Sequence, residues 1–211
     1  HELKTPLAII STQLEMMNMD NDEAMSEYYE SIMEEIQKMS NLIREMLNSS
    51  FEGDIILSGP MKVASLSELL AGMKDKYMGL FWSKKANCRF DIEDNIYINM
   101  NNEQIEQAIN NYIINAYEHI PEKGTAVVTL KSVGDKAVIS VFNDGNNIKE
   151  EELNKIWQGF YQTDERVKES NVGLGLYIVR NIVKNHNGVC YAKNHHNGVE
   201  FVMEFNRTDK Y

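Results

Sequence analysis

The 211-residue chain is 43% hydrophobic and 25% charged, which is typical of soluble globular proteins, and it is long enough for one or two domains with a packed core. Its formal net charge is −11, from 32 acidic and 21 basic residues, so its surface repels phosphate backbones and nucleic acid is excluded as the expected partner. No run of about 18 uncharged apolar residues and no charged-then-apolar leader occurs, so we predict neither a transmembrane helix nor a signal peptide.

Two helices are predicted in the first quarter of the chain. Apolar residues recur at helical spacing over residues 3–19 and again over 28–47, and the polar residues 18–21 interrupt the pattern. Two helices joined by a short turn form a hairpin. Because one long apolar stripe on each arm cannot be buried within a single hairpin, we predict that residues 1–50 self-associate into a four-helix bundle, as a homodimer. The polar, glycine-containing residues 51–60 form the predicted linker.

Residues 61–211 are predicted to form a second domain with helices and strands. Helical periodicity occurs in three stretches: residues 66–82, 103–120 and 173–185. Alternating or β-rich stretches predict six strands: residues 88–92, 96–98, 125–133, 137–142, 189–193 and 199–205. Turn signals at residues 134–136 and 197–198 predict two strand hairpins. Strands and helices without strict alternation favour a helix-on-sheet sandwich, so the predicted fold class is α+β.

Three separate segments carry candidate chemistry. The neutral imidazole of His1 is a nucleophile at neutral pH, and Thr5 lies on the same helix face four residues later. Asn111 and Asn115 also share a helix face, where amide oxygens could meet a hard cation directly or through water. The glycine turn at residues 173–175 opens a helix whose free N–H groups and dipole favour an anion. Each segment alone is also compatible with an ordinary surface.

The order of these segments is more specific than any one of them. The run His1-Glu2-Leu3-Lys4-Thr5-Pro6-Leu7, the run Asn111-Tyr112-Ile113-Ile114-Asn115-Ala116 and the run Val172-Gly173-Leu174-Gly175-Leu176 together resemble the catalytic region of bacterial two-component sensor histidine kinases. The resemblance implies a phosphoacceptor hairpin that dimerises, followed by an ATP-binding α/β sandwich of the Bergerat, or GHKL, type.

The same resemblance implies an activity and a set of roles in the hairpin. His1 is autophosphorylated from Mg-ATP and passes the phosphoryl group to an aspartate on the receiver domain of a response regulator. Glu2 acts as base and orients the imidazole, and Thr5 positions water for phosphatase action on the partner. Because the chain begins with a motif this central, and with His1 rather than Met, we expect it to be the cytoplasmic portion of a larger, membrane-anchored protein.

The resemblance also implies a nucleotide site. Asn115 is the expected direct Mg²⁺ ligand and Asn111 its support. In the first glycine box, residues 142–148, the family spacing makes Asn143 the expected hydrogen-bond acceptor for adenine. Asp144 is expected to contribute little to nucleotide affinity. The remaining residues implied to bind nucleotide come from the glycine boxes, the aromatic box and the lid at 162–172: Gly145, Ile148, Tyr161, Arg166, Lys168, Gly173, Leu174, Gly175 and Leu176.

Several positions depart from the family pattern, and alternatives stay open. Glu118 stands where a basic residue is common, Asn147 replaces the second glycine, and Asn143 replaces an aspartate, a variant similar to that of vancomycin-resistance sensors. Asn111 matches the water-activating glutamate of related ATPases, and an amide cannot act as a base. This favours phosphoryl transfer to histidine over hydrolysis. Two alternatives stay open: a stand-alone ATPase of the same fold, which Asn111 and the histidine motif disfavour, and a non-catalytic scaffold that binds a response regulator, which Glu118 and Asn143 suggest. The histidines after residue 1 lack metal-ligand spacing, so no transition metal is expected.

Overall fold

The computed structural model describes residues 4–17, 28–29, 31–33, 35–36, 39, 59–159, 161 and 173–209. The chain divides into two compact units, residues 1–56 and residues 57–211. Within the described ranges, every helix is too short or too polar to cross a lipid bilayer.

The first unit is helical. Helix α1 covers Lys4–Met17, and the described residues between 28 and 39 are also helical. The Gln13 side-chain amide donates to the Ser31 hydroxyl, which joins α1 to the second helical stretch. Ile32 is buried, but other large apolar side chains stay exposed: Ile9, Leu14, Tyr29 and Ile36. The described part of the unit therefore exposes apolar side chains, as the predicted self-association requires.

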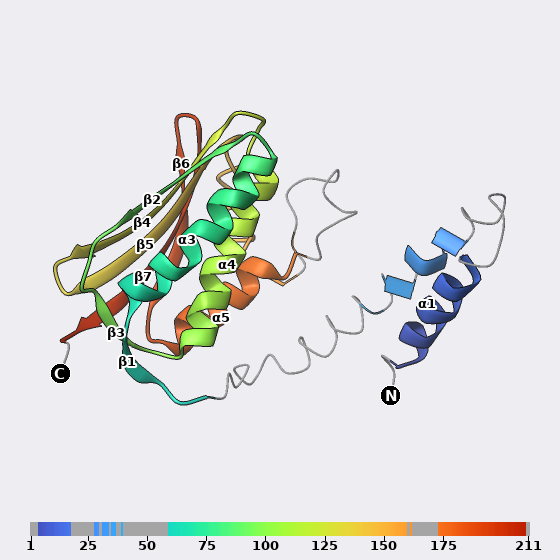
Figure 1. The fold of residues 1–211 in the computed structure, drawn as a ribbon, viewed down its shortest axis with the longest axis horizontal. Helices are drawn as coiled ribbons and strands as arrows, with labels where there is room; N and C mark the ends of the chain where they lie inside the picture. Colours follow the sequence, from blue (N-terminus) through green and yellow to red (C-terminus); the bar gives the residue numbers. More distant parts are fainter. Residues whose placement is uncertain are drawn as a thin grey trace. The chain divides into compact units, whose positions relative to one another are not determined.

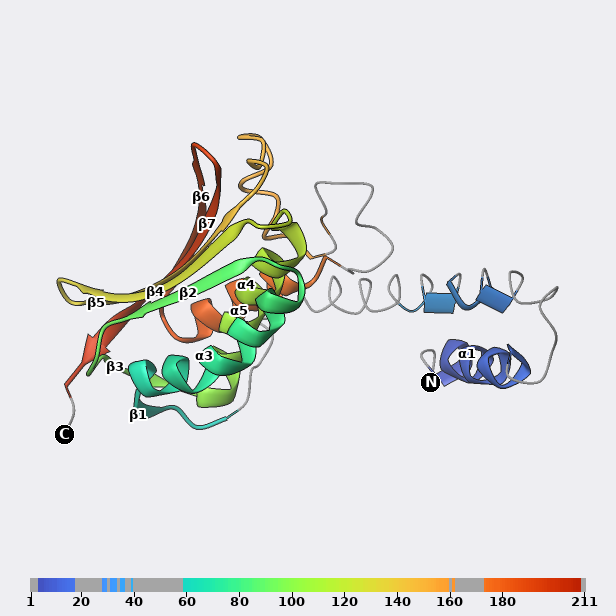
Figure 2. The same ribbon diagram turned by 45° about the horizontal axis from the view of Figure 1, so that its top comes forward.

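The second unit is one sheet with helices on one face (Figures 1 and 2). Its strands are β1 Lys62–Ser65, β2 Asn87–Ile92, β3 Tyr97–Met100, β4 Thr125–Val133, β5 Lys136–Asp144, β6 Val189–His195 and β7 Gly198–Thr208. Its helices are α3 Leu66–Ser83, α4 Asn102–His119 and α5 Gly175–Asn185. The strand order is β1-β3-β7-β5-β4-β2, and β6 pairs with β7. Only β2 and β4 pair in parallel among the described strands.

The core lies between the sheet and the three helices. Strand alternation decides which side chains enter it: Ile139 and Val141 of β5 are fully buried, whereas Val138 and Phe142 on the opposite face are only half-buried. The helices contribute apolar residues at helical spacing, such as Ile105, Ile109 and Ile113 of α4. The predicted α+β sandwich is thus confirmed.

Side chains cap both long helices at their N-termini. The Ser65 hydroxyl accepts a hydrogen bond from the Glu68 N–H at the start of α3, and the Asn101 amide oxygen accepts from the Gln104 N–H at the start of α4. Such caps satisfy one of the N–H groups that a helix leaves unpaired. The cap residue Ser65 also ends β1, a short edge strand that the sequence pattern does not predict.

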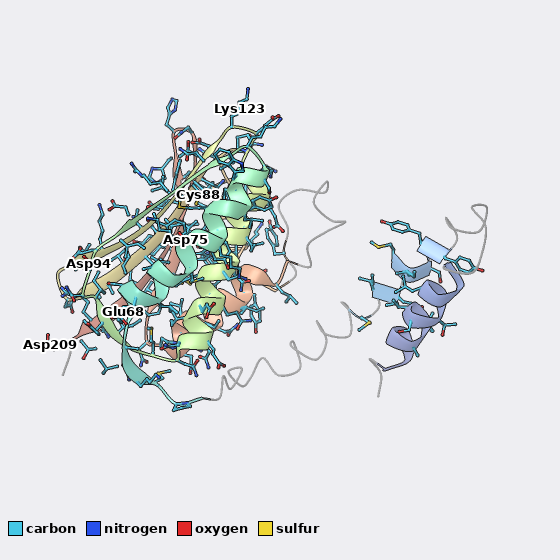
Figure 3. All side chains as sticks on the ribbon, viewed as in Figure 1. Glu68, Asp75, Cys88, Asp94, Lys123 and Asp209 are labelled. Carbon is cyan, nitrogen blue, oxygen red and sulfur yellow. The ribbon has the colours of Figure 1, made fainter. Side chains whose placement is uncertain are left out.

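Both cysteines are reduced thiols in the second unit. Cys88 is buried on β2 close to α3 (Figure 3), and Cys190 is half-buried on β6. Burial raises the pKa of each thiol to about 11, so both stay protonated at neutral pH.

A buried histidine ties the start of α4 to the end of α5. The His186 Nδ1–H group donates to the Ile182 carbonyl (2.7 Å), and Nε2 accepts from the Asn101 N–H (3.0 Å). Nearby, the Asn185 amide donates to the Gln104 side-chain oxygen (3.1 Å). Because Nε2 must be unprotonated to accept, this contact needs the neutral imidazole.

We therefore predict that the second unit loses stability as the pH falls below about 6.5. Burial lowers the pKa of His186 in the folded chain, so the unfolded chain binds the proton first and the contribution of the neutral histidine is complete only above its unfolded pKa. Urea denaturation between pH 8 and pH 5.5, followed by the fluorescence of Trp82 and Trp157, measures the effect. The variant His186→Gln should show a flatter dependence on pH, and an equally steep dependence would contradict the assignment.

Candidate functional site

A cavity of about 370 Å³ opens beside α4 in the second unit. Its walls come from the second half of α4, the end of β5 with the segment after it, the start of α5, and β7. The turn after α4 carries Lys123, labelled in Figure 3, which marks this end of the unit. Eight of the predicted nucleotide-binding residues line the cavity: Asn111, Asn115, Asn143, Ile148, Tyr161, Gly173, Gly175 and Leu176. Gly145 and Leu174 are described but do not form part of its wall.

Asn143, rather than its neighbour Asp144, belongs to the cavity wall. The Asn143 side chain is only 3% exposed, and its amide nitrogen donates to the Asp144 main-chain carbonyl (3.0 Å). With the nitrogen engaged in this bond, the amide oxygen is the group left to accept from a ligand. The side chain therefore offers an acceptor at this end of the cavity, as a carboxylate would, but without its charge.

Asp144 has a structural task that the sequence did not indicate. One carboxylate oxygen accepts from the Thr125 N–H (2.7 Å), and the other accepts from the Asn197 side-chain amide (2.7 Å). The Asn197 carbonyl in turn accepts from the Gly145 N–H (3.0 Å). The carboxylate thus joins the end of β5 to the start of β4 and to the turn between β6 and β7.

Two glycines allow the close backbone approach at this corner. Gly145 has a φ angle of +148°, and a Cβ atom there would lie 3.0 Å from the His119 carbonyl oxygen. A Cβ atom at Gly198, which pairs with Asp144, would lie 2.0 Å from the Asn143 carbonyl oxygen. Any side chain at Gly198 would therefore push β7 away from β5 and displace Asn143. The sequence pattern indicates only a hairpin turn at Gly198 and not this close approach.

The two predicted asparagines lie one turn apart on α4. Tyr112 and Ala116, each next to one of them, are fully buried, and this fixes the rotation of the helix and turns both amides toward the cavity. The Asn111 nitrogen donates to the Gly175 carbonyl (3.3 Å), which links α4 to the first residue of α5. The Asn111 oxygen and the half-buried Asn115 amide remain as oxygen donors for a hard cation.

The charged residues of the cavity wall are two acids, Glu118 and Glu152, one lysine, Lys149, and the titratable His119. Lys84, at the end of α3, adds a cation behind this wall. Its ammonium group donates to the main-chain carbonyls of Tyr117 (2.7 Å) and Glu118 (3.2 Å). A cation at a helix C-terminus offsets the negative end of the helix dipole, so Lys84 reduces the negative potential at this end of α4.

Aromatic residues close one side of the cavity. The hydroxyl of Tyr161 donates to the Glu152 carboxylate (3.3 Å). Desolvation and the nearby Glu152 charge raise the pKa of Tyr161, so the hydroxyl stays protonated and able to donate. Behind the wall residue Phe201, the rings of Tyr112 and Trp157 pack at centroid distances of 5.5 and 6.3 Å. This packing gives the cavity a rigid apolar base.

Some predicted residues cannot be placed. His1, Glu2, Arg166 and Lys168 lie outside the described residues, and of Thr5 only the backbone within α1 is described. Their roles stay predictions. Among the residues that the structure does describe, no group of three or more His, Cys, Asp or Glu side chains could hold a metal ion.

Each of the two units contains residues that match a known protein family. Residues 100–209 match the family described as histidine kinase-, DNA gyrase B-, and HSP90-like ATPase. Residues 1–52 match the His Kinase A (phospho-acceptor) domain. The first match covers the α4 to β7 part of the sheet unit, including the whole cavity wall.

Relatives and solved structures agree with these matches. Sporulation kinase A of Bacillus subtilis is 28% identical across 97% of this chain and 33% of its own length. Sensor histidine kinase CusS of Escherichia coli is 25% identical across 96% of this chain and 43% of its own length. The chain thus spans less than half the length of these curated relatives.

Two crystal structures of histidine kinase ThkA are similar in fold. Its catalytic domain superposes with a TM-score of 0.65 at 27% identity, covering 71% of this chain and 97% of that one. ThkA in complex with response regulator protein TrrA superposes with a TM-score of 0.68 at 26% identity, covering 99% of this chain and 59% of that one.

Proposed function

The chain belongs to the family of histidine kinase-, DNA gyrase B- and HSP90-like ATPases and is a histidine kinase catalytic region, and from this we propose that it transfers the γ-phosphoryl group of ATP to His1. The observation that carries the proposal is the cavity, in which one wall holds the Asn143 acceptor and another holds the Asn111 and Asn115 amides. An adenine and a metal-bound phosphate chain need these two kinds of group at separate places in one site.

Adenine binding would use the Asn143 end of the cavity. The exocyclic amine of adenine is a donor, and the amide oxygen of Asn143 is the acceptor left after its nitrogen binds the Asp144 carbonyl. Apolar wall residues from different elements, Ile148, Leu176 and Val199, supply the surfaces that a flat base needs on its faces. The polar edge and apolar faces of the base would thus each meet a matching group.

Magnesium binding would use α4. Mg²⁺ takes oxygen ligands and usually shares them between one or two side chains and substrate phosphates, so the amide oxygens of Asn115 and Asn111 fit it. When bound, the ion would neutralise charge on the phosphates during transfer. Asn111 also holds the start of α5 through Gly175, and free N–H groups at a helix start favour phosphate. Arg166 and Lys168 are proposed as further γ-phosphate partners.

Phosphoryl transfer is favoured over hydrolysis. Asn111 matches the glutamate that activates water in related ATPases, and the amide cannot accept a proton for this purpose. His1 lies within the phospho-acceptor match and is the nucleophile, with Glu2 as its base. Transfer to a receiver aspartate of a response regulator is the proposed next step, and the solved complex of ThkA with TrrA supports a partner of this class. Thr5 is proposed to serve the phosphatase reaction.

The proposed assembly is a homodimer formed through the hairpin of residues 1–50, joined by a linker at 51–60 to the catalytic unit at 61–211. The exposed apolar residues of the hairpin, among them Leu14 and Ile36, support this assembly. Curated relatives named sensor proteins support a parent protein that is membrane-anchored and carries this region in the cytoplasm.

One experiment separates this proposal from its two alternatives. Incubation with Mg-ATP should give a protein phosphate that is labile in acid and stable in base, which is the behaviour of phosphohistidine. A stand-alone ATPase would release phosphate without retaining label. A non-catalytic scaffold would do neither.

We predict that Asn143→Ala weakens ATP binding about three- to tenfold, because one neutral hydrogen bond contributes about 0.5–1.5 kcal/mol. Asn143→Asp keeps an acceptor and should hold or improve affinity. Calorimetric titration measures both. Asp144→Ala should lower stability, since it removes the contacts with Thr125 and Asn197, and should weaken ATP less than Asn143→Ala. The reverse order of the two alanine variants would show that Asp144 is the adenine ligand.

A further inference from the structure

The crossing segment, residues 145–149, forms one wall of the cavity without belonging to a helix or strand. Four of its members, Asn146, Asn147, Ile148 and Lys149, face the cavity. Backbone outside regular structure needs other partners for its N–H and C=O groups, and a wall built from such backbone holds its shape only if those partners are rigid. At its start the segment is held by the bond from the Gly145 N–H to the Asn197 carbonyl.

A single side chain holds both main-chain polar atoms of Ile148. The Asn194 amide oxygen accepts from the Ile148 N–H (3.0 Å), and the Asn194 amide nitrogen donates to the Ile148 carbonyl (2.7 Å). The nitrogen also reaches the Glu150 carboxylate (3.3 Å). In the described part of the chain, no main-chain group pairs with either Ile148 atom. The side chain therefore takes the place of a neighbouring strand.

The position of Asn194 explains why this contact reaches the cavity. Asn194 lies on β6 directly opposite Val199 of β7, and alternation turns its side chain to the same face of the sheet. Val199 is itself part of the cavity wall, as is Ile148. Asn194 thus connects the rigid β6–β7 ladder to the crossing segment beside the ligand site, although it does not line the cavity.

The chemistry of the contact requires a carboxamide. Only a group with one donor and one acceptor on the same carbon can match an N–H and a C=O group of one residue. A carboxylate offers two acceptors, and its second oxygen would face the Ile148 carbonyl oxygen at the 2.7 Å distance now bridged by a hydrogen bond. Asn147 stands where the family has a second glycine. Because its side chain is larger, the position of this wall matters more here.

We propose that Asn194 is a positioning residue for nucleotide binding, which holds the crossing segment in its binding-competent shape before the ligand arrives. This inference rests on the proposed function, since it assumes that the cavity binds ATP. A cavity wall that is already ordered loses less entropy when the nucleotide binds. A substitution that frees the crossing segment should therefore weaken the affinity for nucleotide. Because Asn194 does not contact the Asn111 and Asn115 side of the cavity, the loss should not depend on Mg²⁺.

The test is calorimetric titration of the 211-residue chain and three variants with Mg-ATP, and with ADP in EDTA. We expect Asn194→Ala and the isosteric Asn194→Asp to raise the dissociation constant about tenfold for both ligands, with unchanged stoichiometry. His195→Ala is the matched control. It alters the next residue of β6, whose exposed side chain pairs with Glu200 on the other face, and should stay within about twofold of the parent.

The outcomes are distinct. A purely structural role would lower the binding stoichiometry, through loss of folded protein, and leave the dissociation constant unchanged, and this result would overturn the positioning role. Equal affinity of Asn194→Ala and the parent at full stoichiometry would overturn it as well. Failure of the parent chain itself to bind either nucleotide would instead refute the proposed function on which the inference rests.

Discussion

Replacement of His1 by glutamine is expected to abolish incorporation of phosphate from Mg-ATP while nucleotide affinity stays within a few fold of the parent. Glutamine keeps the polarity and approximate size of histidine but has no nucleophilic nitrogen at neutral pH. The ATP cavity belongs to the second unit, and His1 belongs to the first, so the substitution leaves every cavity residue in place. Labelling with γ-phosphate-labelled ATP measures the first effect and calorimetry the second.

The matched control is His196→Gln, which changes an exposed histidine in the turn between β6 and β7. It should label like the parent. Equal labelling of His1→Gln and the parent would refute the assignment of His1, and loss of labelling in both histidine variants would show that the assay responds to something other than the acceptor.

Most of the second unit could be predicted from periodicity, because each element has one buried face. The α4 periodicity predicted the helix, and the four-residue spacing of Asn111 and Asn115 predicted that both lie on one helix face. By contrast, β1 has four residues at a sheet edge, too few for a period to be recognised, and it was missed.

The residues of the candidate site also differ in whether a local sequence pattern identifies them. Residues that belong to a contiguous motif, such as Asn143 in the first glycine box, could be named from the sequence. Residues that act through the fold could not, because their partners are far away in the chain: Lys84 binds carbonyls 33 and 34 residues later, and Asn194 binds a residue 46 positions earlier. No local pattern marks such contacts, which are set by strand order and register.

Loss of Asn115 is expected to be the most severe single change within the cavity. The Asn115 amide oxygen is the proposed direct ligand of Mg²⁺. Asn115→Ala removes this oxygen and leaves a methyl side chain that cannot bind the ion. We expect the affinity for Mg-ATP to fall about 100-fold. Asn111→Ala should lower the affinity for Mg-ATP about tenfold, which is the lower end of the range for a residue that supports a metal ligand. Part of this loss comes from the hydrogen bond between the Asn111 amide and the Gly175 carbonyl, which joins α4 to α5.

Titrations with and without Mg²⁺ separate the metal effect from a general loss of binding. In EDTA, Asn115→Ala should bind ATP as weakly as the parent does, because the parent then also lacks the ion. Gln107→Ala is the matched control: it removes an exposed amide from the same helix at a position that does not line the cavity, and it should bind Mg-ATP like the parent. If both asparagine variants also bound Mg-ATP like the parent, the pair would be ordinary cavity-wall residues, and the metal would have to be held by the phosphates and by groups other than these two amides.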